Sequence, residues 1–253
     1  MNKKKGWFIV IGICLILFII NYDFLDSLVE KGLSDSETGI VERVIDGDTI
    51  EVGNNTVRLL GINSPEKGEI GYNEAKAFLE EKILGKEVKL IFGIEKYDKY
   101  YRELASVYLG KENVCLESVR EGYSNIYFPT EESRSSKEFN LFNSAWTDCL
   151  EKEKGLCEKS KNKCANCIKV SDLNLKTQEI KIKNFCSFNC DISKWSVKDE
   201  GRKKYIFGNK ILSGKAEIIL DSEDFKEDYV WTSSGDSFFI RDSFDKLVSW
   251  GTY

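Results

Sequence analysis

The stretch Val41-Glu42-Arg43-Val44-Ile45-Asp46-Gly47-Asp48-Thr49-Ile50-Glu51-Val52 decides the fold of the first half of this chain. A second stretch follows at once, Thr56-Val57-Arg58-Leu59-Leu60-Gly61-Ile62-Asn63-Ser64-Pro65-Glu66. Apolar, often β-branched residues flank an Asp-Gly turn and a Gly-Asn-Asn turn. This pattern predicts a meander of short strands.

The polar residues of the meander suggest a chemistry. Asp48 and Glu66 supply carboxylates, and Asn63 and Ser64 supply further oxygens, which are the ligands that a hard cation such as calcium prefers. Arg58 lies between them, and an arginine near a cation suits a phosphate. The simpler alternative is a hairpin whose Asp-Gly is only a turn and whose arginine is only a surface charge.

A third motif, Tyr97-Asp98-Lys99-Tyr100-Tyr101-Arg102-Glu103-Leu104-Ala105, adds a second arginine ahead of another apolar strand. Taken in order and spacing, the three motifs resemble the staphylococcal nuclease (thermonuclease-like) family over residues 38–157. The resemblance implies a five-stranded OB-type β-barrel with three helices. It also implies a calcium-dependent phosphodiesterase that acts on DNA and RNA.

The resemblance assigns metal-binding roles. Asp48 would be a direct calcium ligand, Ser64 would contribute its backbone carbonyl, and Glu66 would act as general base beside the metal or the attacking water. Asn63 stands where the family usually has a second aspartate. Since ligand charge helps to set calcium affinity, we expect weakened calcium binding.

The same resemblance assigns the phosphate contacts. Arg58 and Arg102 would grip the scissile phosphate and stabilise its transition state, and Lys99 and Tyr100 would contact a neighbouring phosphate. Tyr101 occupies a position where the family has glycine, so its bulk is expected to affect the placement of Arg102.

The composition agrees with a site made of carboxylates and arginines. The chain of 253 residues contains no histidine, which excludes every mechanism that needs one as base, nucleophile or ligand. Residues 38–157 hold 16 Lys and Arg against 22 Asp and Glu, and residues 158–253 hold 17 against 15. Substrate affinity must therefore come from a bound cation and a few placed arginines, and not from a broad basic field.

Helix signals follow the meander. Residues 72–84 place apolar side chains on one face and precede Gly85, Asn113 is a helix cap, and Ser135 or Ser136 caps a third helix. The aromatic residues of the third helix are expected in the core.

The N-terminus carries a membrane signal. Lysines 3–5 precede an apolar run over residues 6–20, without the small residues that a cleavage site needs. We expect residues 1–25 to be an uncleaved anchor, with a cleaved signal segment as the alternative, and residues 26–37 to be a tether. The remaining chain would then lie outside the membrane.

Six of the eight cysteines lie from the end of the third helix onward, at positions 149, 157, 164, 167, 186 and 190. In an outward-facing chain an even set indicates disulfides, in one of fifteen connectivities. The alternative is a structural zinc site formed by the last four. Cys115 is expected to be core. Residues 158–167 form a cysteine-rich junction.

Residues 168–253 alternate short apolar strands with turns at nearly even spacing, which predicts an all-β sandwich. The segments 192–199, 235–242 and 246–250 resemble a lamin-tail domain, an immunoglobulin-like module, which implies binding or positioning of an unknown partner. A basic patch, Lys198, Arg202, Lys203 and Lys204, is expected to be either a solvated hairpin or a nucleic-acid contact.

Together these features predict a membrane-anchored, outward-facing, calcium-dependent nuclease for DNA, RNA or both. The competing hypothesis is a non-catalytic nucleic-acid-binding or surface-binding protein, in which the nuclease barrel is degenerate.

Overall fold

The computed structural model describes residues 36–253. The expected anchor and nearly all of the expected tether lie outside these residues. Among the described residues, no helix is both long and apolar enough to span a bilayer.

The predicted meander is the start of a closed five-stranded barrel. Its strands are β1 (Ser36–Val44), β2 (Thr49–Val52), β3 (Asn55–Leu59), β5 (Glu87–Tyr97) and β6 (Glu103–Leu109), in the order β3-β2-β1-β5-β6. A parallel pairing of β3 with β6, in which Arg58 lies opposite Leu104, closes the sheet on itself. The closure brings the meander next to the hairpin that carries the third motif. The barrel of the predicted fold class is confirmed.

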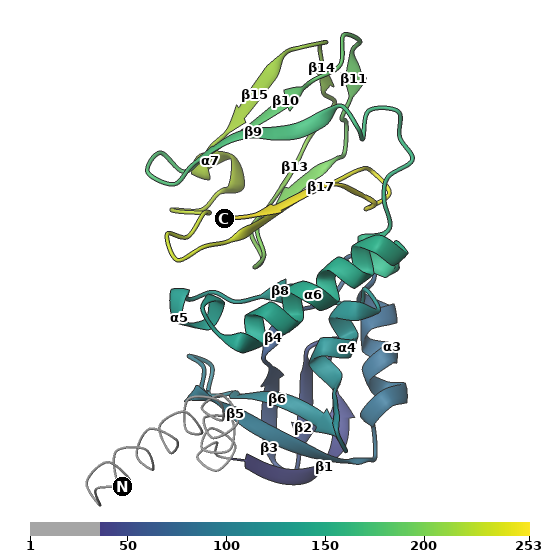
Figure 1. The fold of residues 1–253 in the computed structure, drawn as a ribbon, viewed down its shortest axis with the longest axis vertical. Coiled ribbons are helices and arrows are strands. Elements are labelled where there is room, and N and C mark those ends of the chain that lie inside the picture. The colour runs from purple at the N-terminus through teal and green to yellow at the C-terminus, as the bar shows by residue number, and fades with distance from the viewer. Residues whose placement is uncertain (1–35) are drawn as a thin grey trace, which may run out of the picture. The chain divides into compact units, whose positions relative to one another are not determined.

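Three helices pack against one another beside the barrel (Figure 1). They are α3 (Tyr72–Ile83), α4 (Val114–Arg120) and α6 (Lys137–Lys152). Asn113 and Ser136 cap α4 and α6 by accepting backbone N–H groups, as expected. Gly85 has a φ of 71°, a left-handed conformation that favours glycine after a helix end. The short β4 (Gly61–Asn63) leaves the barrel and pairs with β8 (Asn125–Tyr127).

The C-terminal half, residues 158–253, begins with the cysteine-rich junction, and residues 168–253 form short β-strands, as predicted, with one short helix. One sheet is formed by β9 (Ile168–Asn174), β10 (Glu179–Asn184) and β15 (Glu217–Leu220). A second sheet is formed by β12 (Ser196–Lys198), β13 (Lys204–Ile206), β16 (Ser237–Arg241) and β17 (Leu247–Thr252). The remaining elements of the described chain are short: β7 (Glu112–Asn113), α5 (Glu131–Arg134), η1 (Gly155–Cys157), β11 (Cys190–Asp191), β14 (Ile211–Leu212) and α7 (Ser222–Phe225).

The two halves share a core. Trp146 of α6 is fully buried, and its ring lies 5.7 Å from the ring of Phe239 and 6.0 Å from that of Trp250, measured between centroids. Phe239 and Leu247 belong to the same buried cluster as the interior of the barrel. A separate cluster, which includes Trp195 and Trp231, fills the C-terminal half. The nuclease-like half is therefore not packed independently of the strands that follow it.

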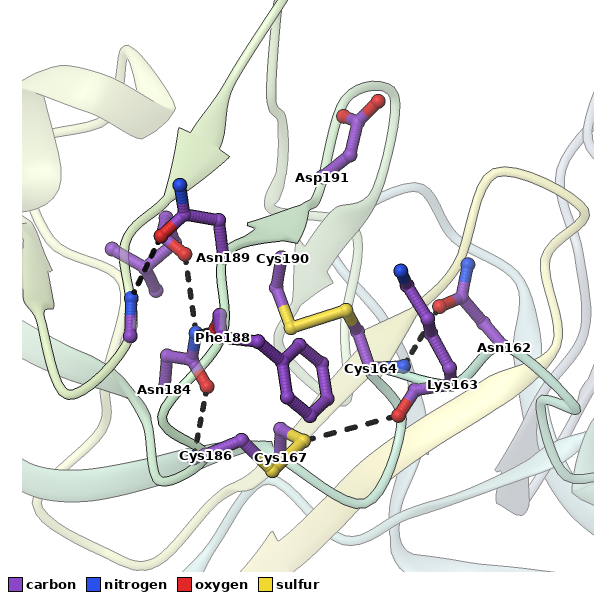
Figure 2. Close-up of a disulfide and its surroundings, with 12 residues drawn as sticks. Asn162, Lys163, Cys164, Cys167, Asn184, Cys186, Phe188, Asn189, Cys190 and Asp191 are labelled. Atoms are coloured by element: carbon purple, nitrogen blue, oxygen red, sulfur yellow. Dashed lines mark hydrogen bonds between the residues drawn. A yellow bond between two sulfur atoms is a disulfide. The ribbon is translucent and has the colours of Figure 1, made fainter.

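The cysteines form three disulfides: Cys149–Cys157, Cys164–Cys190 and Cys167–Cys186. The disulfide interpretation is therefore confirmed over the zinc alternative, and Cys115 is a buried free thiol, as expected. Figure 2 shows the Cys164–Cys190 bond near Asn184, whose amide bonds to the carbonyl of Phe188 and to the N–H of Cys186. The Cys164–Cys190 and Cys167–Cys186 disulfides cross-link the beginning of the C-terminal half, where the strands are short.

Candidate functional site

The Asp46-Gly47-Asp48 turn presents its carboxylate because of close packing. A side chain at Gly47 would place its Cβ 2.5 Å from the Cβ of Ala75 and 2.7 Å from that of Ser64, so only glycine fits. The backbone N–H of Asp48 donates to the Asp46 carboxylate at 3.0 Å. Burial, and then the charge of Asp48, raise the pKa of Asp46. The turn thus concentrates two carboxylates at the end of the barrel.

Asp48 is 3% exposed and accepts hydrogen bonds at both oxygens. Its Oδ2 accepts from the backbone N–H of Ser64 at 2.7 Å and from the Ser64 hydroxyl at 3.0 Å. Its Oδ1 accepts from the Thr49 hydroxyl at 3.1 Å and lies 3.2 Å from Nε of Arg58. A buried charge needs such partners. The first and second motifs therefore meet at this carboxylate.

Arg58 is fixed in place. Its position follows from the β2–β3 register, in which Arg58 lies opposite Thr49. Nη1 donates to the carbonyl of Leu59 at 2.6 Å, and Nη2 lies 3.4 Å from Oδ1 of Asn63. The guanidinium also lies 6.0 Å from the ring centre of Tyr127, within cation–π range. A guanidinium held in this way needs little reorganisation to bind a phosphate.

Asn63 links the barrel to the C-terminal half. Its Nδ2 donates to the backbone carbonyl of Glu200 at 3.0 Å and to that of Gly201 at 2.8 Å. An aspartate at this position would have no hydrogen to donate and would face two carbonyl oxygens. The departure from the family pattern therefore has a physical reason, which is contact with residues about 137 positions away.

The side chain of Glu66 lies outside this cluster and contacts a different partner. Its side chain is 42% exposed, and Oε1 lies 2.7 Å from Nε of Arg202. Its backbone N–H donates to the carboxylate of Glu69 at 3.0 Å. The structure therefore brings Asp48, Arg58, Asn63 and Ser64 into mutual contact and places Glu66 beside an arginine of the C-terminal half.

Arg102 lies in the β5–β6 hairpin. The carboxylate of Asp98 accepts from the Arg102 backbone N–H at 3.0 Å and from its Nε at 2.7 Å. Burial acts to raise the pKa of Asp98, but the hydrogen bonds from Arg102 and Tyr100 outweigh it and lower this pKa. Tyr101 has a φ of 61°, which explains the glycine preference of the family, and its side chain is 89% exposed. Tyr101 therefore points to solvent, and Asp98 still holds Arg102.

One cleft of about 730 Å³ joins the two halves. From the barrel half it is lined by Arg58, Asn63, Lys99, Tyr100, Arg102 and Tyr127, among others. From the C-terminal half it is lined by residues 199–203 and by Tyr229 and Asp236, among others. Of the predicted residues, Lys99 and Tyr100 thus share a cleft with both predicted arginines, and Asp48 lies behind Arg58.

The basic patch is only partly a solvated hairpin, so that interpretation is wrong for two of its members. Lys198 is 9% exposed, and its Nζ lies 3.4 Å from the Glu69 carboxylate, while Nζ of Lys204 lies 3.1 Å from the same group. Burial opposes the effect, but the charges of Lys198 and Lys204 lower the pKa of Glu69 to about 2. These two lysines join the halves, and Arg202 and Lys203 face the cleft.

Sequence reasoning missed a group of buried acids under the cleft. Burial, and then the neighbouring Asp236, raise the pKa of Asp199 to about 7. Burial raises the pKa of Glu200 to about 8, against the opposing effect of its ion pair with Arg134. Asp236 accepts the backbone N–H of Glu200 at 3.2 Å. The strand pairing of β12 with β16 creates this group, and the only sequence signal for it was the polar run beside the basic patch.

Comparisons with known proteins identify relatives of the barrel half. The sequence model of the family described as staphylococcal nuclease homologue matches residues 56–158. The thermonuclease of Staphylococcus intermedius is 31% identical over 140 residues, which cover 51% of this chain and 83% of the relative. An uncharacterized endonuclease of Haemophilus influenzae is 33% identical over 128 residues, covering 45% and 68% respectively.

A third relative is much longer. Endonuclease YhcR of Bacillus subtilis is 29% identical over 138 residues, which cover 47% of this chain and 11% of that protein. All three relatives match this chain over about half its length. Because the matches to the thermonuclease and to the Haemophilus influenzae endonuclease span most of each relative, this chain belongs to the staphylococcal nuclease family.

Proposed function

We propose that this protein is a calcium-dependent phosphodiesterase that hydrolyses DNA, RNA or both. The observation that carries the proposal is the cluster of Asp48, Arg58, Asn63 and Ser64, with Arg102 lining the same cleft as Arg58. The family relationship supports a nuclease. Phosphodiester hydrolysis requires charge stabilisation and an oriented water, and these groups can supply both.

The donor set fits a hard cation in kind. Every candidate ligand atom is an oxygen: the carboxylates of Asp48 and Glu66, the amide oxygen of Asn63 and the backbone carbonyl of Ser64. The set is low in charge, since only Asp48 and Glu66 contribute a carboxylate. Within residues 36–253 no group of three or more His, Cys, Asp or Glu side chains is arranged to hold a metal. Weak calcium binding is the expected consequence. A bound cation would supply positive charge to the phosphate.

The residues of the chain carry the other steps. Arg58, held by Asp48 and the carbonyl of Leu59, would bind a non-bridging phosphate oxygen. Arg102, held by Asp98, would stabilise the charge that develops in the transition state. Glu66 would accept a proton from the attacking water, once its carboxylate is free of Arg202.

The surroundings support a location outside the cell membrane. Three disulfides within residues 149–190 are typical of an oxidising compartment. An anchor over residues 1–25 would hold the enzyme at the membrane. The C-terminal half would be a lamin-tail-like, immunoglobulin-like module, and positioning of a partner is its proposed role.

A nuclease assay on the full chain tests the proposal. Single-stranded DNA should be cut in calcium and left intact in chelator. Arg58→Ala should slow cleavage by at least about 10³-fold, because it removes a fixed transition-state donor, and Glu66→Gln by about 10²-fold or more. Arg43→Ala is the matched control, since Arg43 pairs with Glu51 on the surface and does not line the cleft.

Two results would contradict the proposal. Binding of the oligonucleotide without cleavage in calcium would favour the degenerate, binding-only barrel. Cleavage by Glu66→Gln at the parent rate would remove Glu66 from its proposed role.

A further inference from the structure

The turn between β12 and β13 reaches the candidate active site from the C-terminal half. It is closed by two hydrogen bonds: the Asp199 N–H donates to the carbonyl of Lys203 at 3.0 Å, and the Lys203 N–H donates to the side-chain carboxylate of Asp199 at 2.9 Å. Two carbonyls of this turn accept from Asn63. The turn is thus bonded to a residue that itself contacts Arg58.

The turn carries a third arginine into the cleft. Arg202 lines the cleft together with Arg58 and Arg102, and its side chain is 60% exposed. Its Nε lies 2.7 Å from the carboxylate of Glu66. A guanidinium beside a carboxylate presents five donors, of which this contact uses one. The remaining donors of Arg202 are available to a phosphate at the edge of the site.

Three acids of this wall are less accessible than Arg202. Asp199, Glu200 and Asp236 are between 2% and 5% exposed and accept hydrogen bonds within the protein. Glu95 and Glu227 are exposed acids of the cleft, so its charge is mixed. A phosphate would therefore be bound by particular cations, foremost Arg202, and not by a broad basic field.

An aromatic ring accompanies the cations on each wall. Tyr229 is 57% exposed, and Nζ of Lys203 lies 3.7 Å from its ring centre. On the barrel wall, Tyr100 is 64% exposed, with Nζ of Lys99 at 5.1 Å and the guanidinium of Arg102 at 5.5 Å. Exposed aromatic rings among cations are the means by which proteins bind unpaired nucleic-acid strands.

We infer that the C-terminal half supplies a second wall of the nucleic-acid site, in which Arg202 binds a substrate phosphate and Tyr229 stacks on an unpaired base. The inference rests on the proposed function and adds to it the residues that lie outside the nuclease family match, which ends at residue 158. In the free protein the carboxylate of Glu66 forms an ion pair with Arg202. A strand entering the cleft takes Arg202 and leaves Glu66 free for water.

Binding and cleavage are separated in the test. The full chain, in chelator so that no cleavage occurs, is titrated with a labelled single-stranded oligonucleotide over a series of salt concentrations. Arg202→Ala should raise the dissociation constant about tenfold, which corresponds to the loss of one charged hydrogen bond. It should also reduce the slope of log affinity against log salt by about 0.7, the value for one lost phosphate contact on a single strand.

Tyr229 is tested through a conservative pair. Tyr229→Ala should weaken binding about fivefold or more through lost stacking, and Tyr229→Phe should restore it because the ring face remains. Lys176→Ala is the matched control, since Lys176 is exposed on the same half and does not line the cleft. Thermal unfolding of each variant checks that the fold is kept.

The outcomes separate the two proposals. If Arg58→Ala loses cleavage while Arg202→Ala binds with the parent affinity and salt slope, the second wall is wrong and the nuclease stands. If Arg202→Ala binds or cuts better than the parent, Arg202 only restrains Glu66 and the inference is again wrong. If the parent neither binds nor cuts nucleic acid, both proposals fall.

Discussion

The two halves of the molecule contribute to the candidate site in different ways. The barrel half brings charged side chains together through local strand pairing, as Asp48 and Arg58 show across the β2–β3 hairpin. The C-terminal half contributes backbone carbonyls and one arginine from a turn more than 130 residues away. The chemistry of the site is therefore encoded locally, whereas its wall and the identity of residue 63 are encoded at long range.

The halves are also expected to differ in how much their disulfides contribute to the free energy of unfolding. In a variant that already lacks the Cys167–Cys186 bond, Cys164→Ser with Cys190→Ser opens a link between residues 26 positions apart; Cys149→Ser with Cys157→Ser opens one between residues 8 apart. In the chain-entropy model the first pair should lower the free energy of unfolding by about 3.5 kcal/mol and the second by about 2.5 kcal/mol. Urea unfolding followed by circular dichroism measures both.

The order of these two losses shows which half depends more on its cross-link. A larger loss from the Cys149–Cys157 pair would mean that the barrel half, and not the strand half, depends more on its cross-link. An Ellman assay on the denatured, unreduced protein gives the control, because the cysteines at 149, 157, 164, 167, 186 and 190 should not react.

The substitution Asn63→Asp tests whether the long-range contacts of residue 63 determine its identity. The family motif favours aspartate for calcium, but the carbonyls of Glu200 and Gly201 require a donor. In calcium-free buffer the variant should lose about 2 kcal/mol of stability, the cost of a buried polar group left without a partner. Thermal unfolding with and without calcium measures this loss and any recovery on adding the ion. An unchanged melting temperature in chelator would show that the turn does not depend on Asn63.

The smallest effect concerns pH. The pKa of Asp199 is raised to about 7, so the folded state keeps a proton that the unfolded chain releases near pH 4. The stabilisation is therefore complete below about pH 4 and is lost as the pH rises through 7. Across this window the melting temperature of Asp199→Asn should fall less than that of the parent, by a few degrees. Parallel curves for the two proteins would contradict the assignment.

Much of the barrel could be predicted because its signals are local. The Asp-Gly turn, the caps at Asn113 and Ser136 and the periodicity of α3 each act within a few residues. The contacts among Asp48, Arg58 and Ser64 follow from strand pairing within the motif. The even spacing of turns likewise indicated the strands of the second half.

The remainder depended on which strands pair across the chain. Lys198 and Lys204 form a basic run in the sequence, but their charges are used against Glu69, which no local pattern indicates. The partner of Glu66 could not be derived either, since Arg202 reaches it only when the β12–β13 turn lies against the barrel. In both cases the sequence gives the charge of the side chain, but it does not predict which distant residue that side chain contacts.

The burial of Trp146 has a consequence for biosynthesis. Its ring is covered by Phe239 and Trp250, which follow Trp146 by more than 90 residues and so leave the ribosome well after the barrel. Until they emerge, a newly made barrel exposes a large aromatic surface, the kind of site that chaperones hold and that drives aggregation. The barrel is therefore expected to complete its packing only after the strands that carry Phe239 and Trp250 have been synthesised.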